Sequence, residues 1–209
     1  MSFSLRRPLL LGTCVIALGV SAPAALADYL WLESASGQPA KAYLSEFQPG
    51  EHLSLAKLVE PQWVGADGKK QALSANGDAY TVPAAAGDLR VSAKLPEGGK
   101  LTIYEAKAGR TETKAGNDLE LVPISPNGNT FKLHWKGSVV SASQVNVHTS
   151  QEWNRTIKPA ADGSVTLDTP FAGRYVLEVA AQVNGAVKVD GKQYDSVVHV
   201  ATLSFTVER

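Results

Sequence analysis

Residues 197–207, which read VVHVATLSFTV, decide the fold class because polar and apolar side chains alternate along them. In an extended chain Leu203 and Phe205 point to one face, while Thr202 and Ser204 point to the other. A period of two predicts a β-strand with one buried face. The stretch therefore indicates an all-β protein.

Three earlier stretches, residues 131–135, 145–148 and 174–179, alternate in the same way. Their inward side chains are predicted to be Phe131, Leu133, Trp135, Val145, Val147, Tyr175, Leu177 and Val179. Their outward side chains are predicted to be Lys132, His134, Asn146, His148, Arg174, Val176 and Glu178. These runs alternate with turn-forming pairs: Pro49-Gly50, Asp67-Gly68, Asn76-Gly77, Gly98-Gly99, Asn127-Gly128, Asp162-Gly163, Asn184-Gly185 and Asp190-Gly191. Short strands between closely spaced turns are typical of a β-sandwich.

One segment has helical spacing instead. Leu55, Leu58 and Val59 recur at the helical period, Ser54 precedes them as a possible cap, and Pro61 follows. We expect one short helix or helical turn here.

A weak internal repeat suggests a duplicated architecture. Residues 66–93 and residues 161–180 each combine a tight-turn hairpin with a strand that a glycine introduces. We predict two tandem β-sandwich domains of immunoglobulin-like or transthyretin-like type, at residues 28–114 and 115–209. One elongated sandwich is the alternative.

The first 27 residues have the pattern of a secretory signal. Arg6 and Arg7 precede an apolar run at residues 9–20, and Ala25-Leu26-Ala27 fits the small-x-small cleavage rule. The run is shorter than the roughly 20 apolar residues of a membrane span. We expect cleavage before Asp28 and a periplasmic location.

The composition argues against several classes of function. Cys14 is the only cysteine and lies inside the apolar run, so cleavage would leave no disulfide, thiolate metal site or cysteine nucleophile. The chain has 20 basic and 20 acidic residues and no basic stripe, which argues against nucleic-acid binding. No second hydrophobic span follows the signal, so no transmembrane segment is expected in the mature chain.

Several segments resemble a bacterial periplasmic family described as a nickel- or cobalt-uptake component of unknown detailed function. The matching segments are Leu30-Trp31-Leu32-Glu33, Ser45-Glu46-Phe47, Leu119-Glu120-Leu121-Val122-Pro123, Asp162-Gly163, Gly173-Arg174-Tyr175, Asp190-Gly191-Lys192, Tyr194-Asp195 and His199-Val200-Ala201-Thr202-Leu203. The resemblance implies a non-catalytic accessory protein that binds or escorts a divalent nickel or cobalt ion, with an envelope transporter or other periplasmic protein as partner. The family opens with a histidine where this chain has Asp28, whose carboxylate is a harder ligand than imidazole.

The candidate metal ligands are His199, Asp195, His134 and His148. His199 and Asp195 share a face by parity, so they either hold a metal or hydrogen-bond in the core. His134 and His148 lie on strands that, if paired, would bring their Cβ atoms about 5 Å apart. Otherwise they are two solvated histidines.

The alternative function is an immunoglobulin-like interaction module that contacts an envelope protein or a glycan. Trp153 is the best exposed aromatic candidate because polar residues flank it, whereas Trp31 and Trp135 are expected in the core. The sequence contains no Gly-x-Ser-x-Gly elbow, His-Glu-x-x-His helix or phosphate-binding glycine loop, so we expect no enzyme activity.

Overall fold

The computed structural model describes residues 28–208 except positions 36 and 65–67, so the predicted signal sequence lies outside the described residues. Within the described part of the chain every regular element is a β-strand, and no helix is long and apolar enough to cross a membrane. The strands are β1 Tyr29–Glu33, β2 Ala40–Ser45, β3 Val59–Val64, β4 Lys70–Ala72, β5 Ala75–Asn76, β6 Ala79–Val82, β7 Leu89–Glu97, β8 Lys100–Ala108, β9 Leu119–Pro123, β10 Thr130–Trp135, β11 Ser138–Val140, β12 Val145–Thr149, β13 Asn154–Ile157, β14 Ser164–Thr166, β15 Gly173–Val189 and β16 Lys192–Val207. The predicted all-β fold of packed sandwiches is confirmed.

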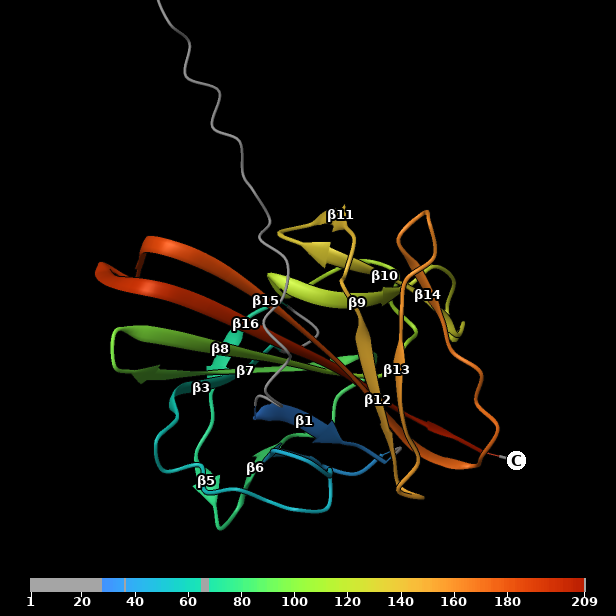
Figure 1. Ribbon diagram of the computed structural model, residues 1–209. Coiled ribbons are helices and arrows are strands. Elements are labelled where there is room, and N and C mark those ends of the chain that lie inside the picture. Colours follow the sequence, from blue (N-terminus) through green and yellow to red (C-terminus); the bar gives the residue numbers. More distant parts are fainter. Residues whose placement is uncertain (1–27, 36, 65–67, 209) are drawn as a thin grey trace, which may run out of the picture.

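The strands form three sheets. An eight-stranded sheet has the order β13-β12-β15-β16-β8-β7-β3-β4, and every neighbouring pair in it is antiparallel except β16 and β8. A four-stranded sheet, β1-β2-β6-β5, lies on one face of it, and a sheet of β9, β10, β11 and β14 lies on the other (Figure 1). The molecule is therefore three sheets thick where the outer sheets overlap.

The eight-stranded sheet consists of two halves of four strands each. Strands β4, β3, β7 and β8 come from the first half of the chain, and β13, β12, β15 and β16 come from the second. The halves join through the parallel pair β8–β16, in which His199 aligns with Ile103. Each half contributes an antiparallel hairpin, β7–β8 or β15–β16, at the seam. The domain boundary between residues 114 and 115 stays a prediction; it falls in the connection between β8 and β9.

Two cores occupy opposite faces of the shared sheet. One packs β1, β2 and β6 against β7 and β8 and includes Val176 and Val200, and the other packs β9 and β10 against β12, β15 and β16. Val176 and Glu178 are therefore buried, although alternation predicted that they face outward. That prediction was wrong because a strand in the middle of three layers is covered on both faces.

Strand β1 lies across the seam and explains the polar face of residues 197–207. The hydroxyl of Thr202 donates a hydrogen bond to the carbonyl of Leu30, and the hydroxyl of Ser204 donates one to the carbonyl of Leu32. Both hydroxyl side chains are buried. These hydroxyls supply hydrogen bonds to backbone carbonyls of β1, which lies at the edge of its sheet beside β2.

Of the short helix or helical turn expected after Ser54, the structure has the turn. The chain makes a single turn in which the amide of Leu58 donates to the carbonyl of Leu55, and Val59 already belongs to β3. Leu55 and Leu58 are both buried, so the helical spacing reflects one turn packed on the core. Pro61 lies within β3 beside a register shift, where a missing amide hydrogen is tolerated.

A cluster of charged side chains, most of them buried, lies against the segment that connects β8 to β9. The ammonium of Lys107 lies 3.1 Å from Asp88 and 3.3 Å from Glu120, and the guanidinium of Arg90 binds both oxygens of Glu120 at 2.9 Å. Glu112 adds an ion pair to Arg90 at 2.6 Å. The charge cluster, Asp88, Arg90, Lys107, Glu112 and Glu120, thus contains opposite charges in direct contact.

The carboxylates of the cluster also hold the connecting backbone. Asp88 accepts the amides of Thr111 and Glu112, and Glu120 accepts the amides of Gly116 and Asn117. Residues 111–117 are therefore fixed to the sheet by buried carboxylates rather than by strand pairing.

We expect stability to fall in acid because of these carboxylates. Burial alone would raise the pKa of Asp88 and of Glu120, but hydrogen bonds from Thr111 to Asp88 and from Arg90 to Glu120 outweigh it and lower both pKa values. A lowered folded pKa gives stability that is present above the unfolded values of about 3.9 and 4.3 and is lost as pH falls below them. Urea unfolding between pH 7 and pH 3 should show this loss beginning near pH 4. Because the cluster is buried, 0.5 M salt should leave the loss in place; a loss that salt abolishes would assign it to exposed pairs.

Candidate functional site

His199 and Asp195, the first predicted metal pair, are not brought together. His199 is buried, its Nδ1 lies 2.9 Å from Glu105, and its ring meets Trp135 edge-on. Asp195 is exposed beside the β7–β8 turn, where its amide donates to the carbonyl of Gly99. The carboxylate that faces His199 is therefore Glu105, which also accepts the amides of residues 118 and 119.

His134 and His148, the second predicted pair, belong to different sheets. His134 is half-buried on β10 near the carbonyl of Gly137, and the neighbours of β10 are β9, β11 and β14. His148 lies on β12, is buried and stacks on Tyr29. The expected outward position of His148 was wrong, because β1 covers that face. Within residues 28–208, apart from the four undescribed positions, no three His, Cys, Asp or Glu side chains group as a metal site.

The predicted aromatic site at Trp153 packs on the protein itself. Its ring meets Phe171 edge-on and lies against the second core. Trp31 is buried as expected, donates to the hydroxyl of Ser45 and lies under the guanidinium of Arg174. The Trp153 loop therefore presents no open aromatic platform.

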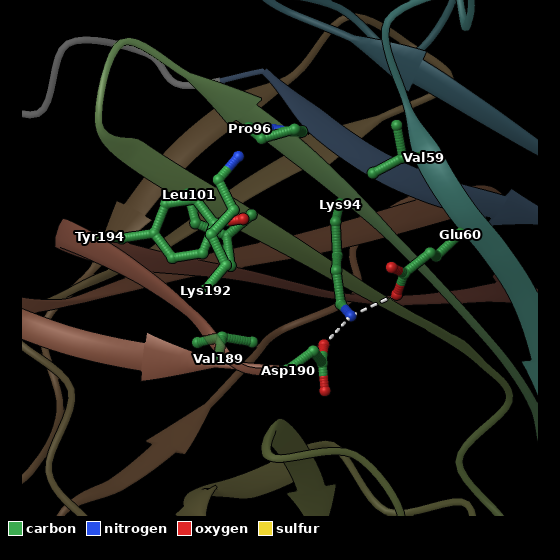
Figure 2. Close-up of a pocket in the computed structure, with 9 residues that line it drawn as sticks. All are labelled: Val59, Glu60, Lys94, Pro96, Leu101, Val189, Asp190, Lys192 and Tyr194. Atoms are coloured by element: carbon green, nitrogen blue, oxygen red, sulfur yellow. Dashed lines mark hydrogen bonds and ion pairs between the residues drawn. The ribbon is translucent and has the colours of Figure 1, made fainter.

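A different feature offers a binding site. Strands β15 and β16 continue past the first residues of β8 (Figure 1), and Asp190 at the tip of their hairpin reaches Lys94 on β7 (Figure 2). A pocket of about 170 Å³ lies under it, which we call the hairpin pocket. It is lined by Val59, Glu60, Lys94, Pro96, Leu101, Val189, Asp190, Lys192 and Tyr194.

Local backbone geometry aims two carboxylates into the hairpin pocket. Asp190 and Gly191 form the two-residue hairpin turn with φ of 48° and 82°, which is the left-handed geometry that Asp-Gly favours. Glu60 has a φ of 51° at the register shift between β3 and β7. A β-bulge re-aims a side chain, and here it directs Glu60 toward the sheet face.

Lys94 lies between these carboxylates (Figure 2). Its ammonium pairs with both Glu60 and Asp190, and only 18% of its side chain is exposed. Burial lowers the pKa of Lys94, but the hydrogen bonds to Asp190 and Glu60 outweigh burial, so the net shift is upward. The lysine therefore stays charged, and two of its three N–H donors are occupied.

Apolar side chains form the other walls of the hairpin pocket. Tyr194 belongs to a small cluster with Leu101 and Val197, and the ammonium of Lys192 lies 5.2 Å from the centre of its ring. Val59 is 41% exposed at the rim. The hairpin pocket thus combines an apolar wall with two cations and two anions.

These side chains are better placed to bind a polar organic ligand than to ligate a metal ion. The ammonium of Lys94 occupies the space between the carboxylates that a cation would need. Glu60 and Asp190 are largely exposed, so their oxygens keep free acceptor positions. The Asp190-Gly191 turn was predicted from sequence, but Glu60 and Lys94 were not predicted as site residues. Pro61 was an available signal for Glu60, because a proline inside a strand often marks a bulge.

A second, more open hollow of about 250 Å³ lies at the opposite end of β16. Its lining includes Arg110, whose guanidinium stacks 4.3 Å from the centre of the Phe205 ring. Arg110 also donates to Gly128 and Asn129. These bonds engage the Arg110 guanidinium with the protein.

Comparison with known proteins leaves the family open. No family model matches the chain, and no curated protein matches it. The solved structures with partial similarity include a biofilm associated protein, BSP domain, at 16% identity and a TM-score of 0.20, with 80% of this chain and 27% of that chain covered. Another is the Bacteroides ovatus mixed-linkage glucan utilization locus SGBP-B in complex with a mixed-linkage heptasaccharide, at 13% identity and a TM-score of 0.21, with 85% of this chain and 46% of that chain covered. The chain thus spans less than half of either protein.

Proposed function

We propose that this protein is a non-catalytic interaction module that binds a glycan in the hairpin pocket, in the periplasm to which the predicted signal would deliver it. One observation carries the proposal: an ammonium group held between two exposed carboxylates beside an apolar wall. Sugar hydroxyls both donate and accept hydrogen bonds, so a sugar ring can use the free carboxylate oxygens and the remaining Lys94 donor together.

An apolar side chain from a protein partner fits this pocket less well. It would cover the remaining Lys94 donor and the carboxylate lone pairs without replacing their hydrogen bonds to water, which is costly. A hydroxyl-rich ligand replaces those bonds. The two cations and two anions of the lining also give no net preference for an acidic ligand.

The test is a binding screen on an array of neutral, amino and acidic oligosaccharides, followed by titration calorimetry of the ligands found. We expect neutral sugars to bind, with a dissociation constant on the order of 0.1–1 mM because the contact is small.

The double substitution Glu60→Gln with Asp190→Asn should weaken this binding about tenfold, because hydrogen bonds to charged acceptors are stronger than those to neutral ones. Asparagine tolerates the positive φ at position 190, so the hairpin turn is preserved. Lys188→Ala is the matched control, since Lys188 is exposed on the same hairpin but does not line the pocket. Equal affinity in the double variant and the wild type, or no binding to any sugar, would contradict the proposal.

A further inference from the structure

Two stacked side chains, one from β1 and one from β12, each carry a buried polar atom without a hydrogen-bond partner. These atoms are the hydroxyl of Tyr29 and Nε2 of His148, whose rings stack with centroids 5.2 Å apart. Buried polar atoms in native proteins nearly always have a partner, so an unpartnered pair calls for an explanation.

A buried carboxylate lies close to one of these two atoms. Oε2 of Glu178 lies 3.9 Å from Nε2 of His148, and the two side chains are 5% and 6% exposed. This separation is too long for a hydrogen bond. It is shorter than the sum of a metal–nitrogen bond of about 2.0–2.1 Å and a metal–oxygen bond of about 2.0–2.2 Å, so one ion can contact both atoms.

Neighbouring amides orient both groups. Nδ1 of His148 lies 3.1 Å from Oδ1 of Asn154, a contact that fixes the ring with Nε2 on the side of Glu178. Asn146 donates to Oε2 of Glu178 at 3.0 Å and accepts from the hydroxyl of Thr156 at 3.1 Å. Metal-binding histidines and carboxylates are commonly held by such outer hydrogen bonds.

The hydroxyl of Tyr29 is a third candidate oxygen, because its ring stacks on that of His148 and the charge of Glu178 acts on it. Burial and the nearby charge of Glu178 raise the pKa of Tyr29, so the phenol stays protonated and is a neutral group near neutral pH. A divalent cation between these groups would be attracted by the carboxylate charge of Glu178 and could be bound by Nε2 of a neutral His148.

We propose that His148 and Glu178 form a binding site for one zinc-class divalent cation under the edge strand β1, with the Tyr29 hydroxyl or water completing the coordination. The site is independent of the hairpin pocket, so it stands or falls separately from glycan binding. It also differs from the four ligands expected from sequence, because only His148 is shared.

The test uses Co²⁺ as a spectroscopic probe on the purified protein. We expect visible d–d absorption that saturates at one Co²⁺ per chain and that Zn²⁺ displaces. His148→Ala should weaken Co²⁺ binding by more than about 100-fold, since the loss of a ligand exceeds the roughly 10–100-fold cost of losing an outer partner. His134→Ala is the matched control and should bind as the wild type does, because His134 lies in another sheet.

Asn154→Ala keeps the test decisive if His148→Ala does not fold. Asn154 is exposed on the edge strand β13, and its loss should weaken Co²⁺ binding about 10–100-fold while urea unfolding stays close to that of the wild type. No absorption in the wild type would show that His148 and Glu178 do not bind the ion. Unchanged affinity in His148→Ala, or in Asn154→Ala, would place the metal elsewhere. Each of these results overturns the proposal.

Discussion

Replacing Lys107 with methionine is expected to lower the free energy of unfolding by about 3–5 kcal/mol. Lys107 is fully buried, and its ammonium contacts Asp88 and Glu120. Methionine retains the apolar stem but removes the charge, which leaves two buried carboxylates with Arg90 as the remaining cation in direct contact with Glu120. Urea unfolding of both proteins at pH 7 measures the difference.

Lys57→Met is the control for this substitution. Lys57 pairs with Glu97 at 3.4 Å, but 79% of its side chain is exposed. Exposed pairs contribute about 0–1 kcal/mol, so the control should unfold nearly as the wild type does. Equal effects of the two substitutions would mean that the charge cluster is not a buried network.

Replacing Phe131 with alanine is expected to cost about 3–5 kcal/mol of unfolding free energy. Phe131 is fully buried on β10, between the outer sheet and the shared sheet, and its ring lies 6.2 Å from that of Phe205. The substitution leaves a cavity in the second core, which the strands on either side cannot fill without shifting. Calorimetric melting, supported by urea unfolding, measures the loss.

Phe47→Ala provides the comparison at the surface. Phe47 is 49% exposed and lies in the turn after β2, so its removal should change stability by about 0.5 kcal/mol or less. If Phe131→Ala is as mild as Phe47→Ala, the outer sheet does not pack on the shared sheet as described.

The strands were predictable because their period of two is a local property. Residues 197–207 and 131–135 alternate in sequence and form β16 and β10 in the structure. Their surroundings were not predictable, because alternation shows that a strand has two faces but not what covers each one. Val176 and Glu178 read as exposed for this reason, yet the third layer buries them.

The candidate sites were less predictable because they join residues far apart in sequence. The hairpin pocket brings Glu60, Lys94 and Asp190 together through a fold-back of the β15–β16 hairpin that no local pattern marks. The charge cluster left a trace in sequence, since Asp88 and Arg90 are opposite charges two residues apart that alternate with the apolar Leu89 and Val91. Such pairs indicate a polar stripe on one strand face, but their partners depend on strand order.

Glycan binding at the hairpin pocket is tested most directly by amide correlation NMR of the ¹⁵N-labelled protein, titrated with a sugar selected on the array. We expect concentration-dependent shifts confined to residues around Glu60, Lys94 and the β15–β16 turn at Asp190. Shifts centred on the Trp153 loop, or an unchanged spectrum at saturating sugar, would contradict it.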